Sequence, residues 1–269
     1  MAVRDLRCRD RSYCASPTPI GWPGAVSVGQ SRPMSGYETK QEQITVSGVD
    51  ALTIRSLFDR NQYADPSGAA DRLGISSAAW PLFGLLWPSG VQLAARLAQR
   101  PVGAGERILE IGCGLALASL VSHRRGADVT ASDCHPLAGG FLAENLRLNA
   151  LGPMKYRHGH WSASLLQAQQ AVDEGMQLLS GRFDLIVGSD LLYERDEAGL
   201  LAQFIARHAA PGAQVWIVDP DRGNRAAFNR HMAAHGFVLH DERIDCTAMA
   251  EVAAYKGRLL SYSLEAGRA

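Results

Sequence analysis

The sequence predicts an α/β fold in which helices cover both faces of a doubly wound, mostly parallel sheet. The first observation is the stretch from Arg107 to Leu120, where a short apolar run, two glycines one residue apart and a run of Leu and Ala indicate a strand, a tight turn and a helix. The second is a series of further short apolar runs, separated by segments with helical spacing. Strands that alternate with helices in this way are typical of parallel sheets.

The chain divides into a tail, an extension and a main domain. Residues 1–33 are rich in Arg, Pro, Gly and Ser without periodicity, so we expect a disordered tail, and Met34 is an alternative to Met1 as the native start. Residues 34–90 are interpreted as an N-terminal extension with a β-hairpin and a lid segment, and residues 91–269 as the main domain.

Composition limits the classes of partner. Lys plus Arg equal Asp plus Glu at 27 each and the sequence pI is about 7.1, so no overall field attracts a phosphate backbone and nucleic acid is not an expected partner. Since no apolar run reaches the length of a membrane span and no signal-peptide core is present, we expect a cytoplasmic monomer with no membrane contact. The five cysteines lack zinc-ligand spacing, so we expect free thiols and no metal.

The extension contains a predicted hairpin and two tryptophans. Residues 43–46 and 52–55 are alternating β-branched runs around a Ser-Gly-Val-Asp turn, which is typical of a hairpin. A turn-rich segment then leads to Trp80 and Trp87. These tryptophans are either core aromatics or part of a lid over a ligand. Residues 91–98 have the apolar spacing of a helix.

The turn at Gly112 and Gly114 has the properties of a nucleotide-binding site. Glycine permits unusual dihedral angles and close approach of a ligand, and the N–H groups of the following helix face the same place. The next apolar run ends in Asp133, where a βαβ unit places a carboxylate that accepts the hydroxyls of a ribose. A dinucleotide site requires a small residue at position 117, and Leu117 there weakens the nicotinamide interpretation.

The segment Glu110-Ile-Gly112-Cys-Gly114-Leu-Ala116 resembles the first motif of the class I S-adenosylmethionine-dependent methyltransferases, with Ala116 where a third glycine is usual. The resemblance implies a Rossmann-like doubly wound sheet of seven strands, mostly parallel with an antiparallel last strand. It also implies S-adenosyl-L-methionine as the cofactor, bound by Glu110, Gly112, Gly114 and Asp133. In this arrangement the glycines admit the methionine part and Asp133 holds the ribose.

A proline marks the start of the helix after Asp133. Pro136 is at the expected first helical position, which makes His135 the expected N-cap. Asp133 then comes too early to cap that helix, so its carboxylate remains available for ribose. The helix is followed by a predicted strand at residues 154–158.

His160 and Trp161 follow the end of that strand, where the resemblance implies contact with the adenine of the cofactor. The family often has an acidic or amide residue before such a tryptophan, and His160 occupies that place here. A histidine satisfied in the core or at the surface remains the alternative. Residues 162–180 are polar with scattered leucines and predict a helix and a loop.

A second informative stretch begins with the apolar run at residues 183–187, a predicted buried strand. Its carboxyl end opens onto the ligand crevice of an α/β sheet, so Asp190 and Tyr193 are expected to face the reacting centre. Asp190-Leu-Leu-Tyr193 resembles the Asp-x-x-Tyr motif of the family 16 methyltransferases, the protein lysine methyltransferases of this fold and their bacterial relatives. The alternative is an Asp that caps a helix, with Tyr packed one turn on.

The same family resemblance extends to other positions. Trp87-Pro-Ser-Gly90 resembles the tryptophan-bearing segment upstream of the first motif. The resemblance implies that Asp190 and Tyr193 are catalytic and that Trp87 and Ser189 contact the cofactor with His160 and Trp161.

The remaining segments complete the sheet. Residues 214–218 predict a strand, and Asp219 and Arg222 follow it, where an ion pair within a loop is favoured over a role at a substrate entrance. Residues 237–244 and 258–264 predict two last strands that form an antiparallel pair.

Together these features predict an S-adenosylmethionine-dependent N-methyltransferase that acts on a protein lysine side chain. A small-molecule acceptor is the alternative, because a neutral chain shows no dedicated surface for a macromolecule. A non-catalytic cofactor-binding module is a third class. For a lysine acceptor, Asp190 would orient the amine and Tyr193 would supply an aromatic wall or a phenol oxygen near the developing cation.

Overall fold

The computed structural model describes residues 36–246 and 254–264, and the predicted tail lies outside them. The elements follow one another as β1 (Thr39–Val46), β2 (Val49–Leu57), α2 (Ala69–Arg72), the 3-10 helix η1 (Trp80–Gly84), α3 (Pro88–Gln99), β3 (Arg107–Ile111), α4 (Leu117–Arg124), β4 (Asp128–Asp133), α5 (Ala138–Leu148), β5 (Lys155–His158), α6 (Leu165–Asp173), β6 (Phe183–Ser189), α7 (Leu200–His208), β7 (Ala209–Asp219), α8 (Arg225–Ala234), β8 (Phe237–Cys246) and β9 (Tyr255–Leu264).

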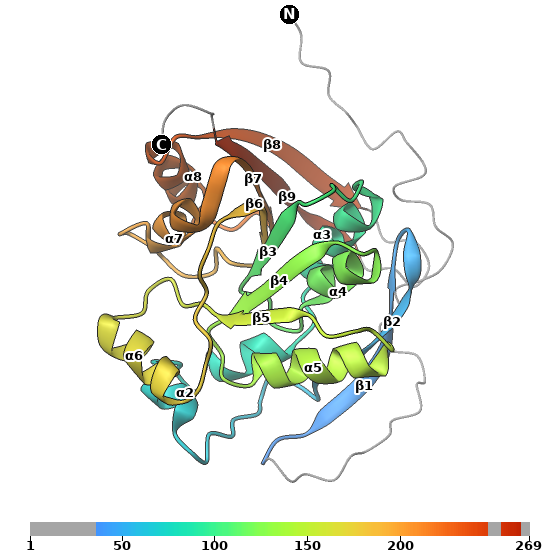
Figure 1. Ribbon diagram of the computed structural model, residues 1–269, viewed down its shortest axis with the longest axis vertical. Coiled ribbons are helices and arrows are strands. Elements are labelled where there is room, and N and C mark those ends of the chain that lie inside the picture. Colours follow the sequence, from blue (N-terminus) through green and yellow to red (C-terminus); the bar gives the residue numbers. More distant parts are fainter. Residues whose placement is uncertain (1–35, 247–253, 265–269) are drawn as a thin grey trace, which may run out of the picture.

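A seven-stranded sheet in the order β5-β4-β3-β6-β7-β9-β8 forms the centre of the molecule (Figure 1). Strands β5, β4, β3, β6 and β7 pair in parallel. Strand β9 is inserted between β7 and β8 and runs antiparallel to both. The predicted fold class is therefore confirmed, including the antiparallel last strand.

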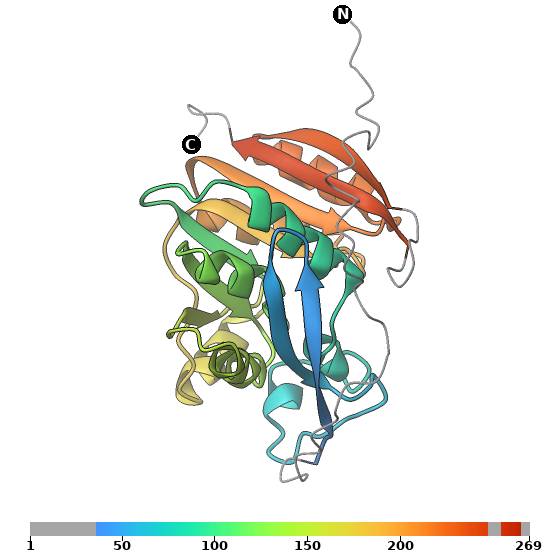
Figure 2. The same cartoon turned by 90° about the vertical axis from the view of Figure 1, so that its right-hand side faces the viewer.

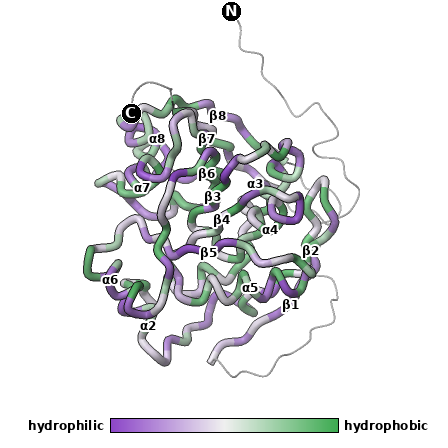
Figure 3. The backbone as a smooth tube through the Cα atoms, in the orientation of Figure 1, coloured by the Kyte–Doolittle hydropathy of each residue, from purple (hydrophilic) through white to green (hydrophobic). Residues whose placement is uncertain are grey.

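Helices cover both faces of this sheet, and each face has its own apolar cluster. Figure 2 shows α3, α4 and the β1–β2 hairpin on one side of the sheet and the helices of the C-terminal half on the other. One cluster joins the hairpin to α3, α4 and α5, and the second joins α7 and α8 to the opposite face. Figure 3 shows hydrophobic residues on the central strands and hydrophilic ones along β1. In residues 36–246 and 254–264, no helix has the length and apolarity needed to cross a membrane.

The N-terminal hairpin is fixed to the main domain by two asparagine side chains of α5. The backbone N–H of Thr53 donates to Asn149 Oδ1 (2.8 Å), and that of Arg55 donates to Asn145 Oδ1 (2.7 Å). Asn149 Nδ2 donates in return to the Thr53 carbonyl (2.8 Å). These amides satisfy the edge of β2 that β1 leaves unpaired. The extension is thus held on the domain, and Phe83 of η1 lies beside Gly114.

Two details differ from the sequence-based expectation. Helix α5 begins at Ala138 with Leu137 at its N-cap, so the prediction that Pro136 is the first helical residue and His135 the cap is wrong. The His135 ring instead accepts the Leu137 N–H at Nδ1 (3.2 Å) within the turn before the helix. Helix α7 was not among the predicted elements, although its Leu, Phe and Ile residues have helical spacing.

Candidate active site

A cavity of about 760 Å³ opens at the carboxyl ends of the central strands. This is where an α/β sheet binds its ligands. Its walls come from the extension, from the turns after β3, β4 and β5, and from the segments after β6 and β7. It is lined by all ten predicted site residues: Trp87, Glu110, Gly112, Gly114, Asp133, His160, Trp161, Ser189, Asp190 and Tyr193.

The conformation of the glycine turn excludes side chains at Gly112 and Gly114. Gly112 and Gly114 have φ angles of 55° and 51°, and Ala116 has 58°, so three alternate residues are left-handed. A Cβ on Gly112 would lie 2.6 Å from the Leu191 side chain, and one on Gly114 would lie 2.8 Å from the Phe83 carbonyl oxygen. The turn therefore needs glycine for both its dihedral angles and its space.

Asp133 is only 7% exposed and is held by the backbone around it. Its Oδ2 accepts the Gly114 N–H (2.8 Å) and its Oδ1 accepts the His135 N–H (2.8 Å). Burial raises the pKa of the Asp133 carboxyl, and these hydrogen bonds oppose the rise. Asp133 thus also shapes the glycine turn, a role that its sequence position did not reveal.

Glu110 joins the end of β3 to the start of α4. Its Oε2 accepts hydrogen bonds from the Ser119 N–H (2.7 Å) and from the Ser119 hydroxyl. Burial raises the pKa of Glu110 to about 7, although the Ser119 bonds act in the opposite direction. The carboxylate therefore satisfies a free N–H in the first turn of the helix and fixes the glycine turn between these two residues.

The two tryptophans of the extension have different roles. Trp80 is 1% exposed and belongs to the core, as one alternative expected. Trp87 lines the cavity, and its Nε1 donates to the Leu82 carbonyl (2.9 Å). Phe83 of η1 stacks on His135 with 3.7 Å between ring centroids. Burial lowers the pKa of His135 to about 3, so this ring is neutral at physiological pH. The extension thus forms one wall of the cavity.

Asp190 lines the same cavity and belongs to an ion-pair cluster. Its φ angle is 57°, and its N–H donates to the Val218 carbonyl (3.0 Å), which fixes it between β6 and β7. Arg222 Nη2 lies 2.8 Å from Asp190 Oδ1, and Arg222 Nη1 lies 3.7 Å from Asp219 Oδ2. Asp219 is fully buried, and its Oδ1 accepts the Arg222 N–H (2.7 Å). The favoured loop ion pair between Asp219 and Arg222 is present, but it extends to Asp190.

The helix-cap alternative for Asp190 is wrong. The next helix, α7, begins ten residues later at Leu200, and Asp196 accepts the N–H groups of its first two residues (2.8 and 2.9 Å). Tyr193 is 47% exposed at the cavity wall, so it is not packed one helical turn from a capping Asp. Asp190 therefore lines the cavity and pairs with Arg222, and it caps no helix.

The remaining predicted residues complete the walls. Trp161 lies beside the glycine turn, since a Cβ on Gly112 would be 3.5 Å from its ring. His160 Nδ1 accepts the Ser162 N–H (3.2 Å), and burial lowers the pKa of this histidine. Ser189 is at the end of β6, next to Asp190. Sequence reasoning did not assign Arg222 to the site, because its link to Asp190 crosses from one strand end to the next.

Comparison with known proteins places the chain among methyltransferases. The model of a family described as "Methyltransferase domain" matches residues 89–246. The chain is 30% identical over 207 residues, 75% of its own length and 72% of the relative, to the electron transfer flavoprotein beta subunit lysine methyltransferase of Mus musculus. It is 27% identical over 147 residues, 51% of its own length and 45% of the relative, to the calmodulin-lysine N-methyltransferase of Arabidopsis thaliana.

Solved structures agree in fold. A SAM-dependent methyltransferase from Agrobacterium tumefaciens superposes with a TM-score of 0.51 at 15% identity, over 83% of this chain and 70% of that one. A methyltransferase from Pyrococcus furiosus superposes with a TM-score of 0.50 at 20% identity, over 74% of this chain and 99% of that one.

Proposed function

We propose that this chain, which belongs to the class I S-adenosylmethionine-dependent methyltransferases, transfers a methyl group to a protein lysine side chain. The observation that carries the proposal is one cavity that is lined both by the glycine turn and Asp133, here called the cofactor end, and by Asp190 and Tyr193, here called the acceptor end. The relatives named above are lysine methyltransferases, which supports an amine as the acceptor.

The residues present fit the cofactor, S-adenosylmethionine. Gly112 and Gly114 line the cavity, so in this proposal the backbone of the glycine turn borders the methionine part of the cofactor. In this proposal the Asp133 carboxylate accepts the ribose hydroxyls, and His160 and Trp161 border the adenine. When bound, the cofactor supplies a methyl group on a positively charged sulfur as the electrophile.

The acceptor end prepares the amine. A lysine ammonium, with a pKa of about 10.4, has no lone pair, so it must first release a proton to solvent. The lone pair of the neutral nitrogen then forms the new N–C bond while the S–C bond breaks and its electron pair stays on sulfur. Asp190 accepts a hydrogen bond from the amine and orients it, and Tyr193 forms an aromatic wall. Correct positioning of two reactants contributes on the order of 7–11 kcal/mol in well-oriented systems.

The experiment is methyl transfer from radiolabelled S-adenosylmethionine to purified electron transfer flavoprotein beta subunit, to calmodulin and to whole-cell extract. We expect label in a protein band, with the methyl group on a lysine by mass spectrometry. Label in the small-molecule fraction alone would overturn the proposal and favour the alternative acceptor class. Cofactor binding without any label would favour a non-catalytic module.

A further inference from the structure

We propose that Arg222 and Asp219 are positioning residues that set the charge of the acceptor end and thereby the protonation of the bound amine. The inference rests on the proposed amine acceptor and adds a role for two residues that do not touch the reacting atoms. It assigns Asp219, the last residue of β7 and the most buried member of the cluster, a function beyond its ion pair with Arg222.

The cluster of Asp190, Asp219 and Arg222 leaves buried polar atoms without hydrogen bonds, which is unusual for an ion pair with a purely structural role. Asp219 is 0% exposed, and the side chain of Asp190 is 10% exposed. In the described residues, Asp190 Oδ2, Asp219 Oδ2 and Arg222 Nη1 are buried without a hydrogen-bond partner. A structural pair would be expected to satisfy these atoms, because an unsatisfied buried polar group costs free energy.

The cluster also carries an unbalanced charge. Two carboxylates share one guanidinium, so the net charge of the ionised cluster is −1. A negative charge near the acceptor stabilises the positive charge that develops on its nitrogen, and it repels an anionic acceptor. Without Arg222 the charge would be −2, which would hold the ammonium form and oppose its deprotonation. Arg222 therefore balances attraction of the amine against release of its proton.

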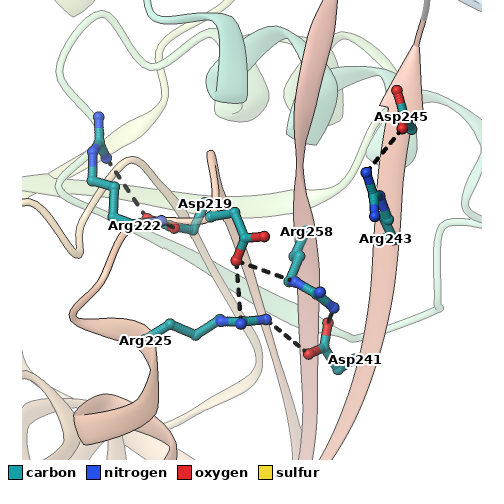
Figure 4. Close-up of polar contacts among 8 residues, drawn as sticks. Asp219, Arg222, Arg225, Asp241, Arg243, Asp245 and Arg258 are labelled. Carbon is teal, nitrogen blue, oxygen red and sulfur yellow. Dashed lines mark hydrogen bonds and ion pairs between the residues drawn. The ribbon is translucent and has the colours of Figure 1, made fainter.

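The position of Arg222 is fixed by a ring of ion pairs on the surface behind it. Arg225 contacts Asp221 (3.2 Å) and Asp241 (3.1 Å), and Arg258 contacts the same two carboxylates (3.2 and 3.0 Å). Figure 4 shows Arg225, Asp241 and Arg258, from α8, β8 and β9, converging on one place. Asp221, in the left-handed region with a φ angle of 66°, precedes Arg222 directly. The loop that carries the guanidinium is thus attached to three elements.

Other ionisable groups surround the cluster, and Tyr193 and Tyr255 feel its charge directly. Tyr255 approaches Asp219 from β9, and its hydroxyl is hydrogen-bonded to that of Ser89 (2.9 Å). The groups that share the cavity wall with the cluster are Glu110, Cys113, Asp133, Cys134, His135, His160, Tyr193, Glu194, Arg195, Asp196, Glu197 and His231.

Two substitutions change the cluster charge in opposite directions. Arg222→Gln gives −2, and Asp219→Asn gives zero while its Oδ1 still accepts the Arg222 N–H. Since an opposite charge within about 4–6 Å shifts a pKa by about 1–3 units, each change should move the pKa of a bound amine by about one unit. Arg107→Gln and Asp184→Asn are matched controls, because that pair (3.3 Å) lies at the opposite end of the sheet.

The first measurement is binding of n-butylammonium, a lysine side-chain analogue, followed by NMR at neutral pH with S-adenosylhomocysteine present. We expect affinity to fall in the order Arg222→Gln, wild type, Asp219→Asn, by about tenfold at each step and about 100-fold between the extremes. 1-Pentanol, which has no charge, should bind all three alike. Equal affinities for the ammonium, or no saturable binding in any variant, would overturn the inference.

The second measurement is the pH dependence of kcat on the acceptor found by labelling. The apparent pKa of the rising limb should be highest in Arg222→Gln and lowest in Asp219→Asn, and Arg222→Lys should return it toward wild type. If Arg222→Gln fails to fold, the inference is tested by the apparent pKa of Asp219→Asn, which should lie below that of wild type, and of Arg222→Lys, which should equal it. Ammonium binding that follows the charge without any labelled lysine would contradict only the proposed acceptor. Labelled lysine with identical pH profiles would overturn only this inference.

Discussion

The two ends of the cavity are built in different ways. The glycine turn and Asp133 of the cofactor end come from one continuous stretch, residues 107–133, and the Asp133 carboxylate there is bonded at both oxygens by backbone N–H groups. The acceptor end is assembled from separate strand ends, and the Asp190 carboxylate is bonded by a guanidinium at one oxygen and by nothing described at the other. A rigid backbone suits a constant ligand, whereas a charged cluster of side chains suits an acceptor that differs among relatives.

The largest expected effect tests the rigidity of the cofactor end. In Gly114→Ala the new Cβ would meet the Phe83 carbonyl oxygen at 2.8 Å in a left-handed residue, so the turn must shift. We expect cofactor affinity to fall by about 100-fold, from the combined cost of strain and overpacking. The measurement is calorimetric titration. Gly105→Ala is the matched control, because Gly105 has a φ angle of 72° and open space around it. A similar loss in both variants would contradict the steric account.

A second prediction concerns the pH dependence of the cofactor end. Burial raises the pKa of Glu110 from 4.5 to about 7, so the folded state binds this proton more tightly than the unfolded state. Its contribution to stability is therefore full below pH 4.5 and is lost as pH rises to about 7, by about 3 kcal/mol at 1.36 kcal/mol per pKa unit.

Glu110→Gln should remove this slope, and the measurement is denaturant unfolding of both proteins from pH 4.5 to 8. The difference between the two curves isolates Glu110, because His135, whose pKa is lowered to about 3, has the opposite sign and is common to both. A difference that does not change with pH would show that Glu110 titrates normally.

At the acceptor end, Asp190→Asn should leave the cofactor in place and slow the transfer. The amide retains an oxygen but loses the charge, so we expect kcat to fall by about 100-fold, with the cofactor Kd within about twofold of wild type. Steady-state kinetics on the labelled acceptor and calorimetry give the two values. Asp184→Asn, on the same strand at its other end, serves as the control. Unchanged turnover under saturating cofactor would remove Asp190 from the mechanism.

The smallest effect is expected for Tyr193→Phe. The Tyr193 ring is half-exposed at the cavity wall, and an aromatic wall needs no hydroxyl. We therefore predict that kcat falls by less than about threefold. A loss of about tenfold or more would instead assign the phenol oxygen a part near the developing cation. The same kinetic assay decides between these outcomes.

The contrast between the two ends also explains what the sequence revealed. Gly112, Gly114 and Asp133 were predictable as neighbours because one βαβ unit brings them together by local rules. Asp190 was placed at the cavity because strand ends meet at one edge of a sheet. Its link to Arg222 was not predicted, since the pairing of β6 with β7 is a tertiary contact. Likewise, the capping role expected of His135 gave way to its stacking on Phe83, from an element far upstream.

The measurement that tests the division of the cavity most directly is parallel calorimetric titration of wild type, Asp133→Ala and Asp190→Ala with S-adenosylmethionine. We predict that Asp133→Ala loses saturable binding, because both the ribose contact and the bond to the Gly114 N–H disappear. Asp190→Ala should bind within about threefold of wild type, a difference of less than about 1 kcal/mol. Equal losses in both variants, or full binding by Asp133→Ala, would contradict the account.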